Sequence, residues 1–164
     1  MPLKRLLAGG SAALVAGTLF HTTSASASSS TCWNYKPAEK AFARKMNRAR
    51  SGLAKLRLDP ELSKVARAHT RAMTGRNLLF HSSTRQLGER VTHWRLLGEN
   101  IGYGSTVRSL HRAFMASAPH RANIRRAEFR HVGVGVRRRG GRLWVTVVFQ
   151  SRTDPGTTLS MPSC

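Results

Sequence analysis

Side chains that can bind a metal or transfer a proton are concentrated in residues 77–105, a stretch that carries His81, His93 and Glu99. Imidazole nitrogen is a common ligand of Zn²⁺, and a carboxylate or water can complete the coordination shell. The stretch contains four glycines, which predict loops. No His-Glu-x-x-His motif places two ligands on one helix face. A metal site here must therefore be assembled from separate segments.

Nucleophilic catalysis has little support in the residues. Serines are plentiful, but none lies in a Gly-x-Ser-x-Gly motif. The only aspartates are Asp59, which is suited to cap a helix, and Asp154 near the end of the chain. A catalytic triad needs a nucleophile, a base and an orienting acid within reach of one another. The sequence therefore favours a binding protein over an enzyme.

The chain is strongly basic, with 28 Lys and Arg against 7 Asp and Glu in 164 residues, a net charge of +21. Six arginines lie near a predicted hairpin and the turn before it: Arg125, Arg126, Arg137, Arg138, Arg139 and Arg142. Guanidinium groups bind phosphate and carboxylate bidentately, so we expect a patch for anionic wall polymers or lipids. The alternative is a solvated surface. No aromatic residues stand between these arginines to stack bases, so specific nucleic-acid binding is not expected.

Residues 1–27 have the pattern of a secretory signal peptide. Lys4 and Arg5 precede a largely apolar run over 6–20, and the segment ends in the small-x-small pattern at Ala27. The alternative is an uncleaved anchor, although the run is shorter than the roughly 20 residues of a spanning helix. We expect a secreted, monomeric protein with no transmembrane segment.

The two cysteines lie near the predicted ends of the mature chain. In an oxidising compartment Cys32 and Cys164 are expected to form a disulfide. This bond would tie a lead segment, 28–36, to a C-terminal tail, 151–164. Two free thiols or an intermolecular bridge are the alternatives.

The remaining chain, residues 37–150, reads as one domain containing several helices. Helical spacing predicts a helix over 37–50 and a second over 60–74, which Asp59 caps. His69 falls on the apolar stripe of the second helix and is interpreted as a structural core residue. A third helix is expected to begin at Ser105 or Thr106 and to end before Pro119, followed by a helical turn over 121–126.

A β-hairpin is predicted around Gly140 and Gly141, which suit a two-residue turn with positive φ. This turn pairs Val136 with Val145, Val134 with Val147 and Val132 with Phe149. Both faces of the hairpin are apolar or small, so the sheet is expected to be covered on both sides. Gly133 and Gly135 are expected to make room for a bulky side chain such as Trp144, or for a closely packed helix.

Seven strings between residues 37 and 150 resemble, in order and spacing, the CAP superfamily of cysteine-rich secretory, antigen 5 and pathogenesis-related proteins, in its bacterial SCP-like branch. They lie at 58–62 (LDPEL), 68–73 (AHTRAM), 80–82 (FHS), 98–104 (GENIGYG), 117–124 (SAPHRANI), 129–135 (FRHVGVG) and 144–149 (WVTVVF). The resemblance implies an α–β–α sandwich. This sandwich agrees with the α+β fold expected from the hairpin, in which helices cover both faces of an antiparallel sheet.

The resemblance also implies a cleft. The family's two histidines and first glutamate correspond to His81, His120 and Glu99, whereas its second glutamate falls at Ser117. Animal members of the family bind sterols or other lipids. We expect Zn²⁺ or another divalent cation to bind transiently to His81 and His120, with Glu99 as a further ligand. The alternative is a polar cluster in which Glu99 orients the histidines.

The expected function is therefore a binding module at or outside the bacterial cell envelope. Two alternatives are a metal-dependent hydrolase that uses the same cleft and a cationic protein that binds anionic polymers or lipids.

Overall fold

A computed structural model describes residues 33–152. The predicted signal peptide, Cys32, Cys164 and most of the predicted tail lie outside the described residues. Within those residues no helix is long and apolar enough to cross a membrane.

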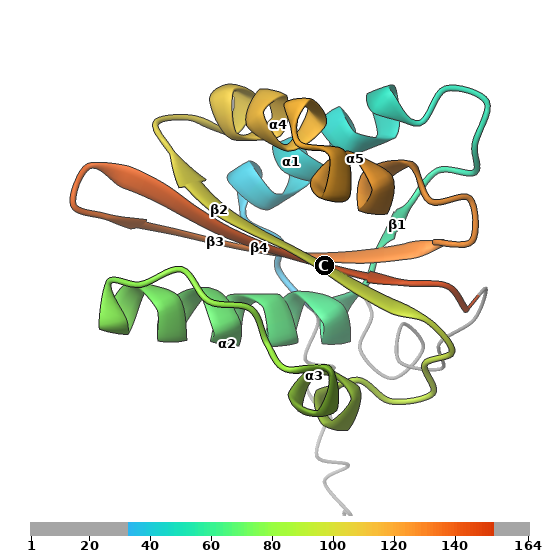
Figure 1. Cartoon of the computed structure of the whole chain (residues 1–164), viewed down its shortest axis with the longest axis horizontal. Helices are drawn as coiled ribbons and strands as arrows, with labels where there is room; N and C mark the ends of the chain where they lie inside the picture. Colours follow the sequence, from blue (N-terminus) through green and yellow to red (C-terminus); the bar gives the residue numbers. More distant parts are fainter. Residues whose placement is uncertain (1–32, 153–164) are drawn as a thin grey trace, which may run out of the picture. The chain divides into compact units, whose positions relative to one another are not determined.

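The described residues form a helix–sheet–helix sandwich (Figure 1). The strands are β1 (Arg57–Leu58), β2 (Leu97–Gly104), β3 (His131–Arg139) and β4 (Arg142–Gln150), in the sheet order β1-β3-β4-β2. Helices α2 (Pro60–Arg76) and α3 (Thr84–Arg90) cover one face, and α1 (Pro37–Ala49), α4 (Val107–Ala116) and α5 (Ala118–Arg125) cover the other. The predicted sandwich is confirmed. The sheet is antiparallel except for β1, which runs parallel to β3.

The hairpin has the predicted register. Val136 pairs with Val145, and both glycines of the turn, Gly140 and Gly141, have positive φ. On β3 a Cβ at Gly133 would lie 2.0 Å from the carbonyl carbon of Leu62. Of the two reasons predicted for this glycine, close helix approach is therefore the correct one. It lets the α2 backbone rest directly on the sheet.

The opposite face is packed through side chains. Phe42 of α1, Phe114 of α4 and Ile124 of α5 are buried against valines of β3 and β4. Apolar area removed from water stabilises this layer by about 25 cal/mol per Å². Side-chain packing is thus the main contact of these three helices with the sheet.

The prediction of loops over 77–105 is wrong in two places, because the segment contains α3 and β2. Its glycines were interpreted as turn residues, but two of them are packing positions within β2. A Cβ at Gly98 would lie 2.8 Å from the ring of Phe129, and one at Gly102 would lie 2.9 Å from the ring of Phe114. The glycines allow large side chains to pack closely against the strand.

The third predicted helix is confirmed as α4, which Thr106 caps by accepting the backbone N–H of Ser109 at 3.0 Å. Pro119 does not simply end the helical region. It lies in the first turn of α5, where its missing N–H leaves no helical hydrogen bond unmade. The chain turns between the two helices at Ser117 and brings α5 beside β2.

Candidate functional site

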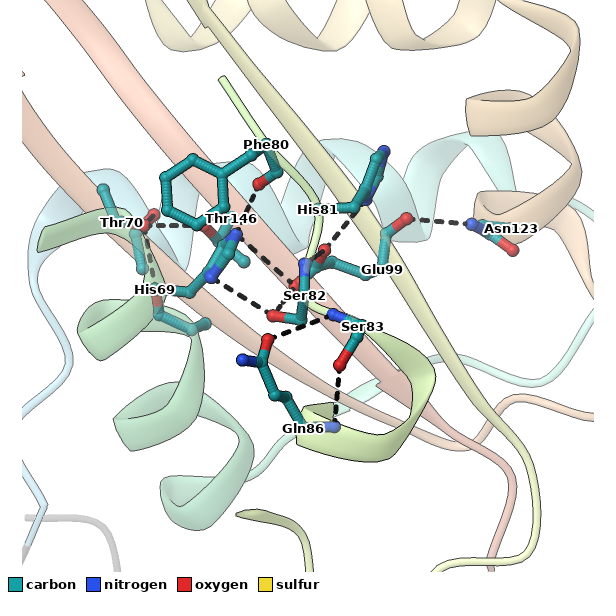
Figure 2. Close-up of polar contacts among 12 residues, drawn as sticks. His69, Thr70, Phe80, His81, Ser82, Ser83, Gln86, Glu99, Asn123 and Thr146 are labelled. Carbon is teal, nitrogen blue, oxygen red and sulfur yellow. Dashed lines mark hydrogen bonds and ion pairs between the residues drawn. The ribbon is translucent and has the colours of Figure 1, made fainter. Parts of the chain in front are cut away.

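Glu99 is the centre of a hydrogen-bonded network on β2, the edge strand of the sheet (Figure 2). Its Oε1 accepts hydrogen bonds from the Ser82 backbone N–H at 2.9 Å and from His81 Nδ1 at 2.8 Å. Its Oε2 accepts from the Ser82 hydroxyl at 2.8 Å. The side chain is only 5% exposed. Both carboxylate oxygens therefore already have partners inside the protein.

His81 is presented to solvent by this network. It lies in the loop between α2 and α3, and its side chain is 56% exposed. Because Nδ1 donates to Glu99, the neutral ring carries its lone pair on Nε2. A carboxylate that holds one histidine nitrogen and leaves the other to a ligand is the usual support of a metal-binding histidine. The same arrangement suits a general base.

His69 supports the network from α2. Its Nε2 donates to the Phe80 backbone oxygen at 2.7 Å, and its Nδ1 lies 3.1 Å from Ser82 Oγ. The Ser82 hydroxyl thus contacts both the Glu99 carboxylate and the His69 ring. The Nε2 atom of His69 lies 3.9 Å from Oε2 of Glu99.

His69 was interpreted as a core residue, and it is indeed 2% exposed. Its contacts with Ser82 and Phe80 also fix the chain on either side of His81, a role that helical periodicity could not reveal. Ser82 was missed as well. Its position in the string FHS, next to His81, was the available signal.

His120 approaches from α5, on the other side of β2. The Asn100 amide donates to the His120 backbone oxygen at 3.0 Å, and the Asn123 amide donates to Asn100 Oδ1 at 2.8 Å and to the Glu99 backbone oxygen at 3.2 Å. The imidazole of His120 stacks on Phe114 with the ring centroids 4.7 Å apart. These contacts bind α5 to the strand that carries Glu99.

The pKa of His120 is lowered, mainly by burial and also by the nearby charge of His81. Burial disfavours the imidazolium form. Burial, and a positive charge on His81 whenever that ring is protonated, therefore both favour the neutral form of His120.

Ser117 joins α4 to α5. Its backbone N–H donates to the Ala113 oxygen, its backbone oxygen accepts from the Arg121 N–H, and the residue is half-buried. It provides no carboxylate. A mechanism that uses two acidic groups in this cleft has only Glu99 at the matched positions.

A cavity of about 410 Å³ opens beside His81 on the α3 side of β2. Its wall combines the polar groups of the network with apolar side chains: His81, Ser82, Thr84, Leu87, Trp94, Leu96, Leu97, Gly98 and Glu99. Trp94, which sequence reasoning did not select, is fixed by its Nε1 donating to the Gly88 oxygen at 2.9 Å. Neither Ser117 nor His120 lines this cavity. The hollow thus lies to one side of the predicted four-residue cleft.

A metal at this site would have few protein ligands. Among residues 33–152 no three His, Cys, Asp or Glu side chains come close enough together to hold one ion. Both carboxylate oxygens of Glu99 already accept hydrogen bonds. Glu99 is therefore better placed to orient His81 than to bind a metal ion itself. Of the two predicted histidine ligands, His81 is exposed to solvent and His120 stacks on Phe114.

The six arginines of the predicted anion patch form two groups. Arg125 and Arg126 lie at the end of α5 near the start of β3, and the other four surround the hairpin turn. The nine residues of β3 span about 27 Å at roughly 3.4 Å per residue. A single small anion cannot contact both groups.

Comparison with known proteins agrees with this fold. Residues 44–149 match the family model of the cysteine-rich secretory protein family, CAP. The chain belongs to this family, and the predicted resemblance is confirmed.

Its similarities place it among the bacterial SCP-type members. YkwD of Bacillus subtilis is 33% identical over 122 residues, which cover 70% of this chain and 46% of YkwD. The SCP domain of an extracellular protein from Bacillus anthracis is 27% identical with a TM-score of 0.62, covering 70% of this chain and 40% of that protein. The chain thus spans less than half the length of either protein.

An outer surface protein of Borrelia burgdorferi has the same fold, with a TM-score of 0.63 at 16% identity, over 70% of this chain and 92% of that protein.

Proposed function

We propose that this CAP domain is a binding module that acts outside the cytoplasm and uses His81 as its principal contact with a ligand. The observation that carries the proposal is the 2.8 Å bond between His81 Nδ1 and Glu99, which directs an unprotonated Nε2 outward from an exposed ring. The similarity to an extracellular SCP-domain protein supports the location, as does the signal pattern of residues 1–27.

The ligand contacts in this proposal are of two kinds. A divalent cation such as Zn²⁺ binds His81 Nε2 and His120, whose lowered pKa keeps its ring neutral. Two protein ligands bind a cation weakly and reversibly, unlike the four of a structural zinc site. The apolar wall formed by Leu87, Leu96 and Leu97 accepts an apolar part of a larger ligand beside the ion.

Titration with Zn²⁺ or Cd²⁺, followed by calorimetry, tests this assignment. His81→Ala and His120→Ala are each expected to weaken binding about tenfold or more, since each removes one of two protein ligands. His93→Asn is the matched control, because His93 is exposed and has a φ of 50°, which asparagine tolerates. Binding that is unchanged in both alanine variants would eliminate the metal site.

Hydrolysis is a second candidate, and one observation favours it: a histidine oriented by a carboxylate can act as the base that activates water. His81 Nε2 would take the proton and Glu99 would hold the ring. Turnover of casein or of wall fragments by the purified protein, abolished by His81→Ala and retained by His93→Asn, would establish it. Absence of turnover in the unmodified protein would leave the binding module alone.

A further inference from the structure

A second hollow, of about 180 Å³, lies away from the His81 site and has a strongly cationic wall. Four of its five lining residues are basic: Lys36, Arg67, Arg71 and Arg137, with Val136 as the fifth. They come from three elements, the residue before α1, the middle of α2 and the exposed half of β3. Figure 1 shows β3 running across α2, which is how segments distant in sequence meet here.

Arg67 is fixed in place before any ligand arrives. Its Nε and Nη2 donate to the two oxygens of Glu39 at 2.7 and 2.5 Å, and Nη2 also donates to the Asn34 oxygen. Its guanidinium lies over the ring of Trp33, 4.3 Å from the centroid. Glu39 is fully buried and neutralises this one cation. Arg67 therefore forms a rigid wall of the hollow.

The other three cations, Lys36, Arg71 and Arg137, belong to none of the ion pairs found between described residues. Within residues 33–152 Glu39 pairs with Arg67, Glu89 with Arg85, and Glu99 with His69 and His81. All three side chains belong to exposed residues. The hollow thus concentrates three positive charges that no ion pair within residues 33–152 neutralises.

Arg137 reaches this hollow because of the alternation of β3. Side chains two residues apart lie on the same face of a strand, so Arg137 continues the row of Gly133 and Gly135 that rests on α2. Arg138 belongs to the opposite face and does not line the hollow. Arg137 and Arg138 are adjacent in the sequence, but only Arg137 lines the hollow.

We propose that this hollow is a binding site for a phosphate-type oxyanion. A tetrahedral oxyanion directs its oxygens toward several sides at once, which suits cations arriving from three elements, whereas a planar carboxylate offers two oxygens. Guanidinium groups bind such oxygens through paired N–H donors. At about 30 Å³ per water molecule the hollow holds roughly six waters, enough for one phosphoryl group. The source is either a soluble phosphate group or the headgroup of an anionic lipid.

Titration of the purified protein with inorganic phosphate at constant ionic strength tests the site, with the arginine Nε–H resonances as the readout. Saturable binding is expected. Arg71→Gln and Arg137→Gln should each weaken it about tenfold, because hydrogen bonds to charged groups are being lost. Arg138→Gln removes the same charge from the same strand and should change binding less than about twofold.

Phosphatidylglycerol vesicles, with phosphatidylcholine vesicles as the neutral control, identify the source. A loss of vesicle binding in Arg137→Gln but not in Arg138→Gln assigns the site to lipid headgroups. An equal effect of both variants assigns it to soluble phosphate groups, because vesicle binding then follows net charge alone. The proposal is overturned if inorganic phosphate does not saturate, or if Arg71→Gln and Arg137→Gln behave like Arg138→Gln in that first titration.

Discussion

On the α2 face of the sheet, backbone rests on backbone at Gly133, and His69, Ser82 and Glu99 are joined by short hydrogen bonds. On the opposite face, α4 and α5 pack through side chains, and the His120 ring is held by stacking on Phe114. The edge strand β2 lies between the hydrogen-bonded cluster of the α2 face and the His120 ring of the opposite face. The difference indicates that His81 is held in one orientation by directional bonds, whereas His120 is placed by packing and kept neutral by burial.

The largest expected effect comes from breaking the backbone contact of the α2 face. In Gly133→Ala the new methyl group would meet the backbone of Leu62 and Ser63 at 2.0 to 2.3 Å, so α2 must move away from the sheet. We expect a loss of at least about 3 kcal/mol in the free energy of unfolding, measured by urea denaturation. Gly75→Ala is the control, since a Cβ there meets nothing within 4 Å. Equal stability of the two variants would refute the backbone contact.

A smaller loss is expected from removing the carboxylate that joins His81 to this face. Glu99→Ala leaves the Ser82 N–H, the Ser82 hydroxyl and His81 Nδ1 without their acceptor, which should lower the free energy of unfolding by about 2 kcal/mol. Glu99→Gln should cost much less. The glutamine Oε1 can still accept from the Ser82 N–H and from His81 Nδ1, and its amide can donate to Ser82 Oγ. If the glutamine variant proves as unstable as the alanine variant, the hydrogen-bond assignment is wrong.

The smallest effect concerns the histidines of the opposite face. Burial lowers the pKa of both His111 and His120 below the ordinary value of about 6.5. Between the lowered pKa values and 6.5 the unfolded chain binds more protons, so the free energy of unfolding falls as the pH drops through this window. The stabilisation is fully present above about pH 6.5.

Urea unfolding at pH 7.5 and at pH 5 measures how the free energy of unfolding depends on pH. The double variant His111→Asn, His120→Asn should show a smaller difference between the two pH values than the unmodified protein. An unchanged difference would show that these rings are not the source of the pH dependence.

Local rules were sufficient for much of the fold. Asp59 caps α2 as predicted, and the two glycines of the hairpin turn set the register of β3 and β4. Local rules failed at positions where residues distant in the sequence decide the structure. Gly98 and Gly102 look like turn residues until the rings that pack on them are known. Arg50, next to a predicted helix end, is fully buried and donates to carbonyl oxygens of four residues, Ala54, Ile124, Arg126 and Phe129.

The candidate site shows the same division. The sequence motifs that resemble the family identified His81, Glu99 and His120. Which of these residues orients and which faces a ligand depends on hydrogen-bond geometry, which a sequence motif does not contain. The basic hollow was not predicted as a unit, because Lys36, Arg71 and Arg137 are separated by more than 30 residues at each step. The packing of α2 under β3 brings Arg71 and Arg137 together, and the pair between Glu39 and Arg67 holds the start of α1 beside them.

Glu99 holds His81 through Nδ1 and, in the neutral ring, leaves Nε2 as an outward lone pair. Long-range ¹H–¹⁵N correlation of the His81 ring at neutral pH tests it directly, because the two nitrogens report which one carries the proton. We expect a protonated Nδ1 and an unprotonated Nε2, with Nε2 alone shifting when Cd²⁺ is added. A protonated Nε2 with a free Nδ1, or a ring that averages between the two tautomers, would contradict the account.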